Sequence, residues 1–204
     1  KGLWGYRPEH LCGFLEWKGK RILEQLIFGS YRLNNGLGLT QGAGLMHSPS
    51  GIHSRPLLLS SLKPYAGAGE SIIHQGFACK LNLGMIKAVF WSSFQTVDLS
   101  LQKTPSLDEK TDWAGFIREG GNHRSPTELS GRNLAYLGSA GVQVVVSLDR
   151  LRLGVQYAPE INGLTGRGKD SLQYFEGPSL YHATSIQAQW KLNKFELYGE
   201  FAPG

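Results

Sequence analysis

The chain has 204 residues, enough for one domain with a sizeable hydrophobic core, and its net charge is +5. Only 18% of the residues are charged and 27 are glycine, which argues against both an intrinsically disordered chain and a helical bundle. No window is apolar enough for a bundle of membrane helices. The class that remains is a glycine- and aromatic-rich β protein, whose mild basicity permits an anionic partner without indicating one.

Eight strands are predicted, most of them arranged as hairpins. Apolar and polar residues alternate on both sides of the two-residue turns at 84–85, 149–150 and 193–194. In such a hairpin the numbers of directly opposed residues have a constant sum, so the turn fixes every partner. The predicted strands are 10–18, 26–39, 72–83, 86–99, 139–148, 151–158, 183–192 and 195–202.

The hairpin over 141–158 shows the alternation most clearly. Val144 is expected opposite Val155, which makes one face apolar, while Gln143 is expected opposite Gln156 on the other face. The last hairpin repeats this pattern. We therefore expect one side of the sheet to carry Gln143, Arg152, Gln156, Gln187, Gln189, Lys191, Glu196 and Glu200, and the other side to carry Val142, Val144, Leu153, Trp190, Leu197 and Phe201.

The lengths of the connections indicate the class of β protein. Two-residue turns alternate with long segments near 40–71, 100–138 and 159–182, and loops of that length are uncommon in compact soluble domains. Short turns on one rim and long loops on the other are typical of outer-membrane barrels. The predicted fold is an all-β, antiparallel up-and-down outer-membrane-type β-barrel, or a part of one, forming a single unit over 1–204.

The polar face separates a membrane barrel from a soluble one. A soluble barrel turns this face to bulk water and usually loads it with Lys and Glu, whereas here it is mostly Gln, Ser, Gly, Asn and Ala. That composition favours a crowded polar lumen. Ring residues near the strand ends (Trp17, Tyr157, Trp190 and Phe201) lie where an aromatic girdle is expected.

Five short segments carry a family resemblance, in the same order along the chain. The run FGSYRLNNGLGL at 28–39 resembles the GDYRLxxGQGL segment of large bacterial outer-membrane proteins that carry competence-type helix-hairpin-helix repeats ahead of a β-barrel. The other segments are HSRP at 53–56 with KPY at 63–65, ESIIHQGF at 70–77, GNHRSPTEL at 121–129 and KFELYGE at 194–200.

The resemblance implies an outer-membrane barrel with a link to DNA handling, and it implies no catalytic residues. Ser30 and Leu37 stand where the family usually has Asp and Gln. Any role of those two family side chains therefore does not carry over to this chain, whereas the expected fold does. The glycine-rich stretch from Asn34 to Gly44 is expected to be a strand whose glycines let an inward-folded loop pack closely.

Two further sets of residues are candidates for binding or catalysis. His123 and Ser125 with Glu128 would suit a barrel hydrolase, but Ser125 followed by Pro126 also predicts the start of a helix. Five basic residues in the two longest connections would form a basic mouth for the phosphates of lipopolysaccharide or DNA, or else a solvated loop surface: Arg55, Lys63, Arg118, Arg124 and Arg132.

These observations together predict a non-enzymatic protein of the bacterial outer membrane, with a role in passage or anchoring that is linked to DNA uptake or surface export. The expected partner is outer-membrane lipid or lipopolysaccharide, with weaker support for nucleic acid, and no metal or cofactor is expected. A complete barrel has an even number of strands and no free edge, so we expect the chain to be a fragment of a larger barrel. The alternatives are a soluble β-barrel that binds a ligand and an outer-membrane lipid hydrolase.

Overall fold

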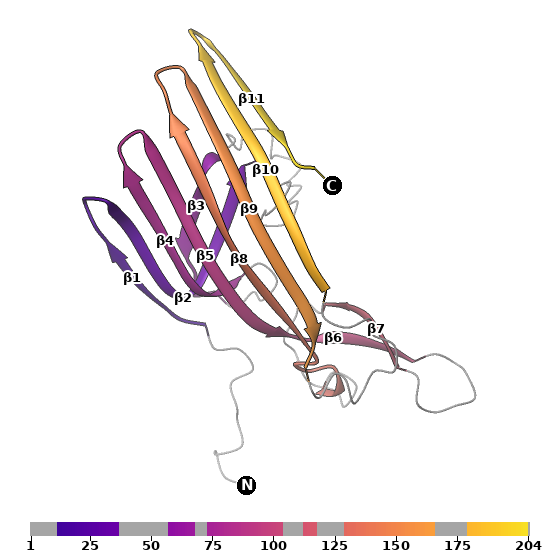
Figure 1. Ribbon diagram of the computed structural model, residues 1–204. Coiled ribbons are helices and arrows are strands. Elements are labelled where there is room, and N and C mark those ends of the chain that lie inside the picture. Colours follow the sequence, from indigo (N-terminus) through magenta and orange to yellow (C-terminus); the bar gives the residue numbers. More distant parts are fainter. Residues whose placement is uncertain are drawn as a thin grey trace.

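The computed structural model describes residues 12–36, 57–67, 73–103, 112–117, 129–165 and 179–203. These residues form eleven strands, all paired antiparallel (Figure 1). In the described part of the chain no helix has the length and hydrophobicity needed to cross a bilayer. The strands are β1 (Phe14–Lys18), β2 (Leu23–Gly36), β3 (Leu57–Pro64), β4 (His74–Leu83), β5 (Ile86–Val97), β6 (Leu99–Lys103), β7 (Asp112–Ile117), β8 (Ala135–Ser147), β9 (Leu151–Leu164), β10 (Ser179–Leu192) and β11 (Phe195–Phe201).

Nine strands form one sheet, with the order β1-β2-β4-β5-β8-β9-β10-β11 and with β3 paired to β2, while β6 and β7 form a separate pair. The main sheet is an up-and-down meander with two excursions, one through β3 and one through β6 and β7. Among the described strands, β1 and β11 each pair with a single neighbour, so the sheet does not close. The fold is therefore all-β, antiparallel and barrel-like, as the sequence predicts.

The four hairpin turns lie side by side along one rim of the sheet (Figure 1). Backbone hydrogen bonds connect each turn to the next hairpin. Asn82 N donates to Ile22 O at 2.7 Å, Ser147 N to Met85 O at 2.8 Å and Lys191 N to Arg150 O at 2.8 Å. The hydrogen-bonded sheet therefore extends into the turns themselves, and the rim is continuous.

The predicted two-residue turns are found at the predicted positions. Leu83 pairs with Ile86, Ser147 with Arg152 and Leu192 with Phe195, and every further pair in these three hairpins has the same sum of residue numbers. Two-residue hairpin turns require residues with positive φ. Gly84 and Asn193 have φ values of 79° and 48°, which glycine and asparagine adopt more readily than other residues.

Three strands lie inside segments that the sequence predicts as loops. The strand β3 interrupts the first long segment, and the pair β6–β7 interrupts the second. The sequence LLLSSLKP of β3 has no clean alternation of polar and apolar residues, so the period-2 criterion misses it. The third long segment is shorter than expected, because β9 continues as far as Leu164 and β10 already begins at Ser179.

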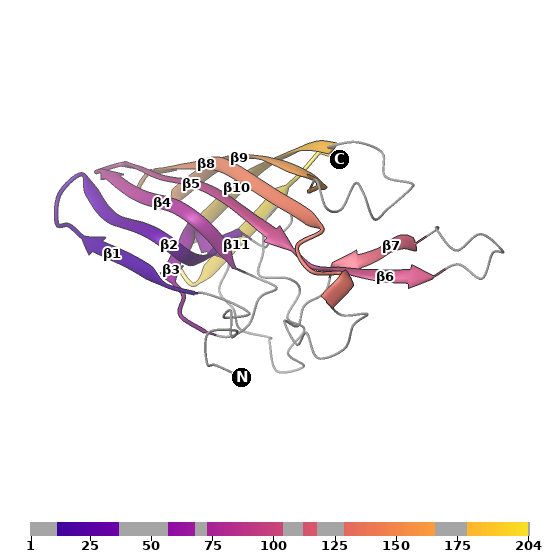
Figure 2. The ribbon, with the colours of Figure 1, turned by 90° about the horizontal axis from the view of Figure 1, so that it is seen from below.

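The sheet curves into a trough. The hairpin formed by the second half of β2 and by β3 lies on the concave side of this trough (Figure 2). The first half of β2 pairs with β1 and β4, and the second half pairs with β3. Gly29 is the last residue of β2 that pairs with β1; its φ is +100°, and a Cβ atom there would collide with the carbonyl oxygen of Gly13. The hairpin then comes close to β5, β8, β9 and β10 across the trough. Asn34–Gly36 ends β2, and the rest of the glycine-rich stretch lies outside the described residues.

Replacing Gly29 by alanine is expected to destabilise the protein by about 2 kcal/mol or more, because an L-residue is strained at this φ and the new methyl group meets the backbone of Gly13. Gly199→Ala is the matched control, since a Cβ at Gly199 meets nothing within 4 Å. Urea unfolding measures the difference. Equal midpoints for the two variants would contradict the requirement for glycine at position 29.

Candidate functional site

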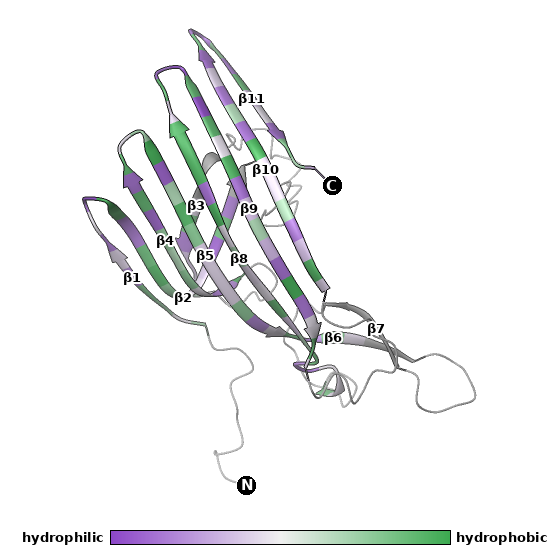
Figure 3. Ribbon diagram, viewed as in Figure 1, coloured by the Kyte–Doolittle hydropathy of each residue, from purple (hydrophilic) through white to green (hydrophobic). Residues whose placement is uncertain are grey.

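The convex face of the sheet is apolar and exposed. Figure 3 shows hydrophobic and hydrophilic residues alternating along the strands of the main sheet, as expected when the two faces differ in polarity. A contiguous apolar patch of this extent is rare on a soluble monomer. The strand registers place the following large exposed side chains on this one face: Leu15, Trp17, Phe28, Phe90, Phe94, Val144, Leu153, Val155, Tyr157, Ile186, Trp190, Leu197 and Phe201.

The concave face carries a network of buried glutamine side chains. Gln143 Nε2 donates to Gln187 Oε1 at 2.9 Å, and Gln187 Nε2 donates to Glu200 Oε1 at 3.0 Å. Gln143, Gln156 and Gln187 are completely buried, with 0% exposure. Because a buried amide without partners is costly, such a network specifies its own geometry.

The remaining predicted polar residues lie on the same face, nearer the turns. Gln189 donates to Glu196 and accepts from Arg152 Nη1 at 3.5 Å, and Lys191 is directly opposite Glu196. Arg152, Lys191 and Glu196 are exposed, unlike the buried glutamines deeper in the trough. The register thus places all eight polar residues named from the sequence on one side of the sheet.

An apolar cluster fixes the β2–β3 hairpin to the concave face. Leu33 and Leu62 of the hairpin are buried with Val89 and Trp91 of β5 and with Ala158 of β9. Burial of this kind contributes roughly 1.5–3 kcal/mol per large side chain. The hairpin is therefore a packed part of the trough and not a surface appendage.

A serine–histidine cluster at the base of the hairpin was not predicted from the sequence. His74 Nδ1 lies 3.1 Å from Ser93 Oγ, which in turn lies 3.1 Å from Ser139 Oγ. Tyr31 stacks on the His74 ring, with the two centroids 5.3 Å apart. Ser93 and Ser139 are directly opposed, but finding that pair from the sequence requires knowing that β5 neighbours β8 across the β6–β7 excursion.

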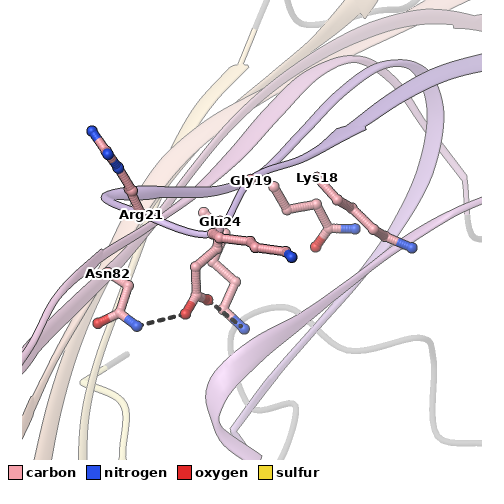
Figure 4. A pocket seen from close by; sticks show the side chains of 8 residues that line it. Lys18, Gly19, Arg21, Glu24 and Asn82 are labelled. Atoms are coloured by element: carbon pink, nitrogen blue, oxygen red, sulfur yellow. Dashed lines mark hydrogen bonds and ion pairs between the residues drawn. The ribbon is translucent and has the colours of Figure 1, made fainter.

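A pocket of about 330 Å³ opens at the rim between the β1–β2 turn and β4 (Figure 4). Glu24 is its central acidic group: it accepts a hydrogen bond of 2.6 Å from Asn82 Nδ2 and forms an ion pair with Lys80 at 3.4 Å. The side chains that line the pocket are predominantly basic or amide: Lys18, Lys20, Arg21, Glu24, Gln25, Lys80 and Asn82, together with Gly19. These residues were not predicted from the sequence as a site, because they are spread over two hairpins.

The predicted basic mouth and the predicted hydrolase residues lie mostly outside the described residues. Arg55, Arg118 and Arg124 are in this group, as are His123 and Ser125. Of the remaining two mouth residues, Lys63 is exposed on β3, and Arg132 is half-buried and follows the two helical residues Leu129 and Ser130. No described group of His, Cys, Asp and Glu has an arrangement that would hold a metal ion.

Comparison of the chain with protein-family models, curated proteins and solved structures finds no match. The class is therefore defined by the fold and its two faces alone. The chain is an antiparallel, barrel-like β-sheet protein with an apolar convex face and a polar concave face.

Replacing Gln187 by leucine is expected to destabilise the fold by about 1–3 kcal/mol, because the buried amide of Gln143 on β8 and the half-buried carboxylate of Glu200 on β11 lose their partner. Gln95→Leu on β5 is the control, since the side chain of Gln95 forms no hydrogen bond among the described residues. Unfolding midpoints measured on both variants test the network. A stability loss no larger for Gln187→Leu than for Gln95→Leu would show that the network does not stabilise the sheet.

Proposed function

We propose that the chain forms part of the wall of a non-enzymatic β-barrel in a bacterial outer membrane, with a role in passage or anchoring. One observation carries the proposal: the exposed apolar face is the convex one, and the buried polar network is on the concave one. A membrane barrel needs this arrangement, with its apolar face toward lipid and its polar face toward the lumen. The resemblance in sequence supports the same class and motivates the link to DNA uptake or surface export.

The soluble ligand-binding barrel, the first alternative, requires the opposite arrangement. A soluble barrel encloses its apolar side chains and shows polar ones to water. Here Val155 and Phe201, at 53% and 65% exposure, would face water on the outside, while fully buried glutamines would fill the inside. The polarity of the two faces therefore favours a bilayer over bulk water.

The β2–β3 hairpin bears on the choice between passage and anchoring. Because Leu33 and Leu62 are packed against β5 and β9, the hairpin occupies part of the concave side. A solute would need a route past this hairpin, or would have to displace it. Anchoring requires no such change, so the described structure favours an anchoring role or a passage that opens only when the hairpin moves.

The lipid hydrolase, the second alternative, has one observation in its favour, the contact between His74 and Ser93. A serine nucleophile needs a neighbouring base and a group that orients the base. In the described structure the other polar contact of this cluster is a hydroxyl, Ser139, and His74 contacts no carboxylate. The cluster therefore supplies a serine and a neighbouring base, but no acidic group that orients the base. For this reason we prefer the non-enzymatic function.

Substituting arginine for Val155 tests the membrane proposal. If the convex face contacts lipid, Val155→Arg should lower stability in a bilayer by roughly 2–4 kcal/mol and reduce the folded protein recovered from outer membranes. On a soluble protein the same exposed position would tolerate arginine within about 0.5 kcal/mol. Asn82→Arg is the matched control on the concave face, where Glu24 can pair with the new cation. Equal recovery of both variants would contradict the proposal.

A second substitution tests the hydrolase. Ser93→Ala should leave hydrolysis of short lipid esters at the level of the wild-type protein, because the proposed function assigns no reaction to this cluster. Ser92→Ala, which removes an exposed hydroxyl next to it, controls for general effects. A measurable esterase activity that Ser93→Ala abolishes and Ser92→Ala retains would establish the enzyme instead.

A further inference from the structure

All of the chain's net charge lies at the rim that the four short turns form. We define the short-turn rim as the turns with five residues on either side, which gives 14–27, 79–90, 144–155 and 188–199. These residues include nine of the 21 Lys and Arg but only four of the 16 Asp and Glu. The rest of the chain holds twelve of each and has no net charge, so the excess of +5 belongs to the rim.

The two basic residues of the β1–β2 turn have no ion-pair partner among the described residues. Glu16 pairs with Lys18 at 3.2 Å, and Glu24 pairs with Lys80 at 3.4 Å. Lys20 and Arg21, in the turn between β1 and β2, are exposed and form no ion pair in the described structure. Figure 4 shows Arg21 extending away from Glu24 and Asn82. The β1–β2 turn therefore keeps a positive charge that the nearby acidic residues do not cancel.

The same turns expose apolar side chains next to the basic ones. Ile22 and Met85 are both 59% exposed, Phe195 is 76% exposed, and Leu148 precedes Arg150. These residues continue the apolar convex face as far as the turns. Where an apolar band ends beside Lys and Arg, the basic side chains lie at the depth of lipid headgroups.

We propose that the short-turn rim binds the headgroups of anionic phospholipids, with the exposed Lys20 and Arg21 of the β1–β2 turn as its main phosphate-binding side chains. This inference rests on the proposed membrane location of the sheet, and it adds the kind of lipid and the rim that recognises it. An anionic lipid surface matches the rim because the positive charge is spread along a continuous, hydrogen-bonded row of turns and is interleaved with apolar side chains. A soluble anion would leave the apolar residues of the turns in water.

Tryptophan quenching by brominated lipids tests the proposal on the full chain. The protein is reconstituted in equimolar phosphatidylcholine and phosphatidylglycerol, with one lipid brominated at a time. Trp17 and Trp190 are exposed on the convex face close to the rim and report the neighbouring lipid. We expect stronger quenching by brominated phosphatidylglycerol. The preference should fall about fivefold or more in Lys20→Gln/Arg21→Gln, since each basic residue contributes about a fivefold preference for an anionic surface.

The control variant Lys63→Gln/Arg132→Gln removes the same charge away from the rim and should keep the wild-type preference. In case the rim variant fails to fold, a salt titration of the wild-type protein gives a second test, because screening should reduce the preference. Equal quenching by both lipids, or a preference that salt leaves unchanged, would overturn this inference and leave the membrane location intact. Absence of quenching by either lipid would instead refute the membrane location.

Discussion

Alternation of side chains along antiparallel strands is the constraint on which the rest of the structure depends. Because successive residues point to opposite faces, one turn fixes the face of every residue in both of its strands. From β8 to β11 this places Gln143 and Gln187 on the concave face and Val155 and Trp190 on the convex face. Two faces of such different polarity suit two different environments, and the membrane barrel that we propose, with lipid outside and a polar interior, provides both.

The β2–β3 hairpin changes what the trough contains. Beyond Gly29, whose positive φ favours glycine, β2 no longer pairs with β1 and goes on to pair with β3. Leu33 and Leu62 enter the trough and pack against Trp91, while the glutamine network lies on the same concave face between β8, β10 and β11. The polar face therefore contains an apolar island, which holds the hairpin in place.

Strand pairing within hairpins was predictable from the sequence, and contacts between hairpins were not. A two-residue turn determines its own register, so pairs such as Trp190 with Leu197 follow from residue numbers alone. The contact of Ser93 with Ser139 depends on which hairpins lie next to each other in the sheet, which local periodicity does not encode. The rim pocket was missed for the same reason, since Lys20 and Lys80 come from different hairpins. The strand β3 was missed because it lacks alternation.

Spin labels placed one by one along β10 would test the central claim most directly. In a background without the free thiols of Cys12 and Cys79, single cysteines from 186 to 190 are labelled, and the protein is reconstituted in lipid bilayers. The account predicts that oxygen, which concentrates in lipid, relaxes the labels at Ile186, Ala188 and Trp190 more strongly than those at Gln187 and Gln189. A uniform response along the strand, or stronger relaxation at the two glutamine positions, would contradict it.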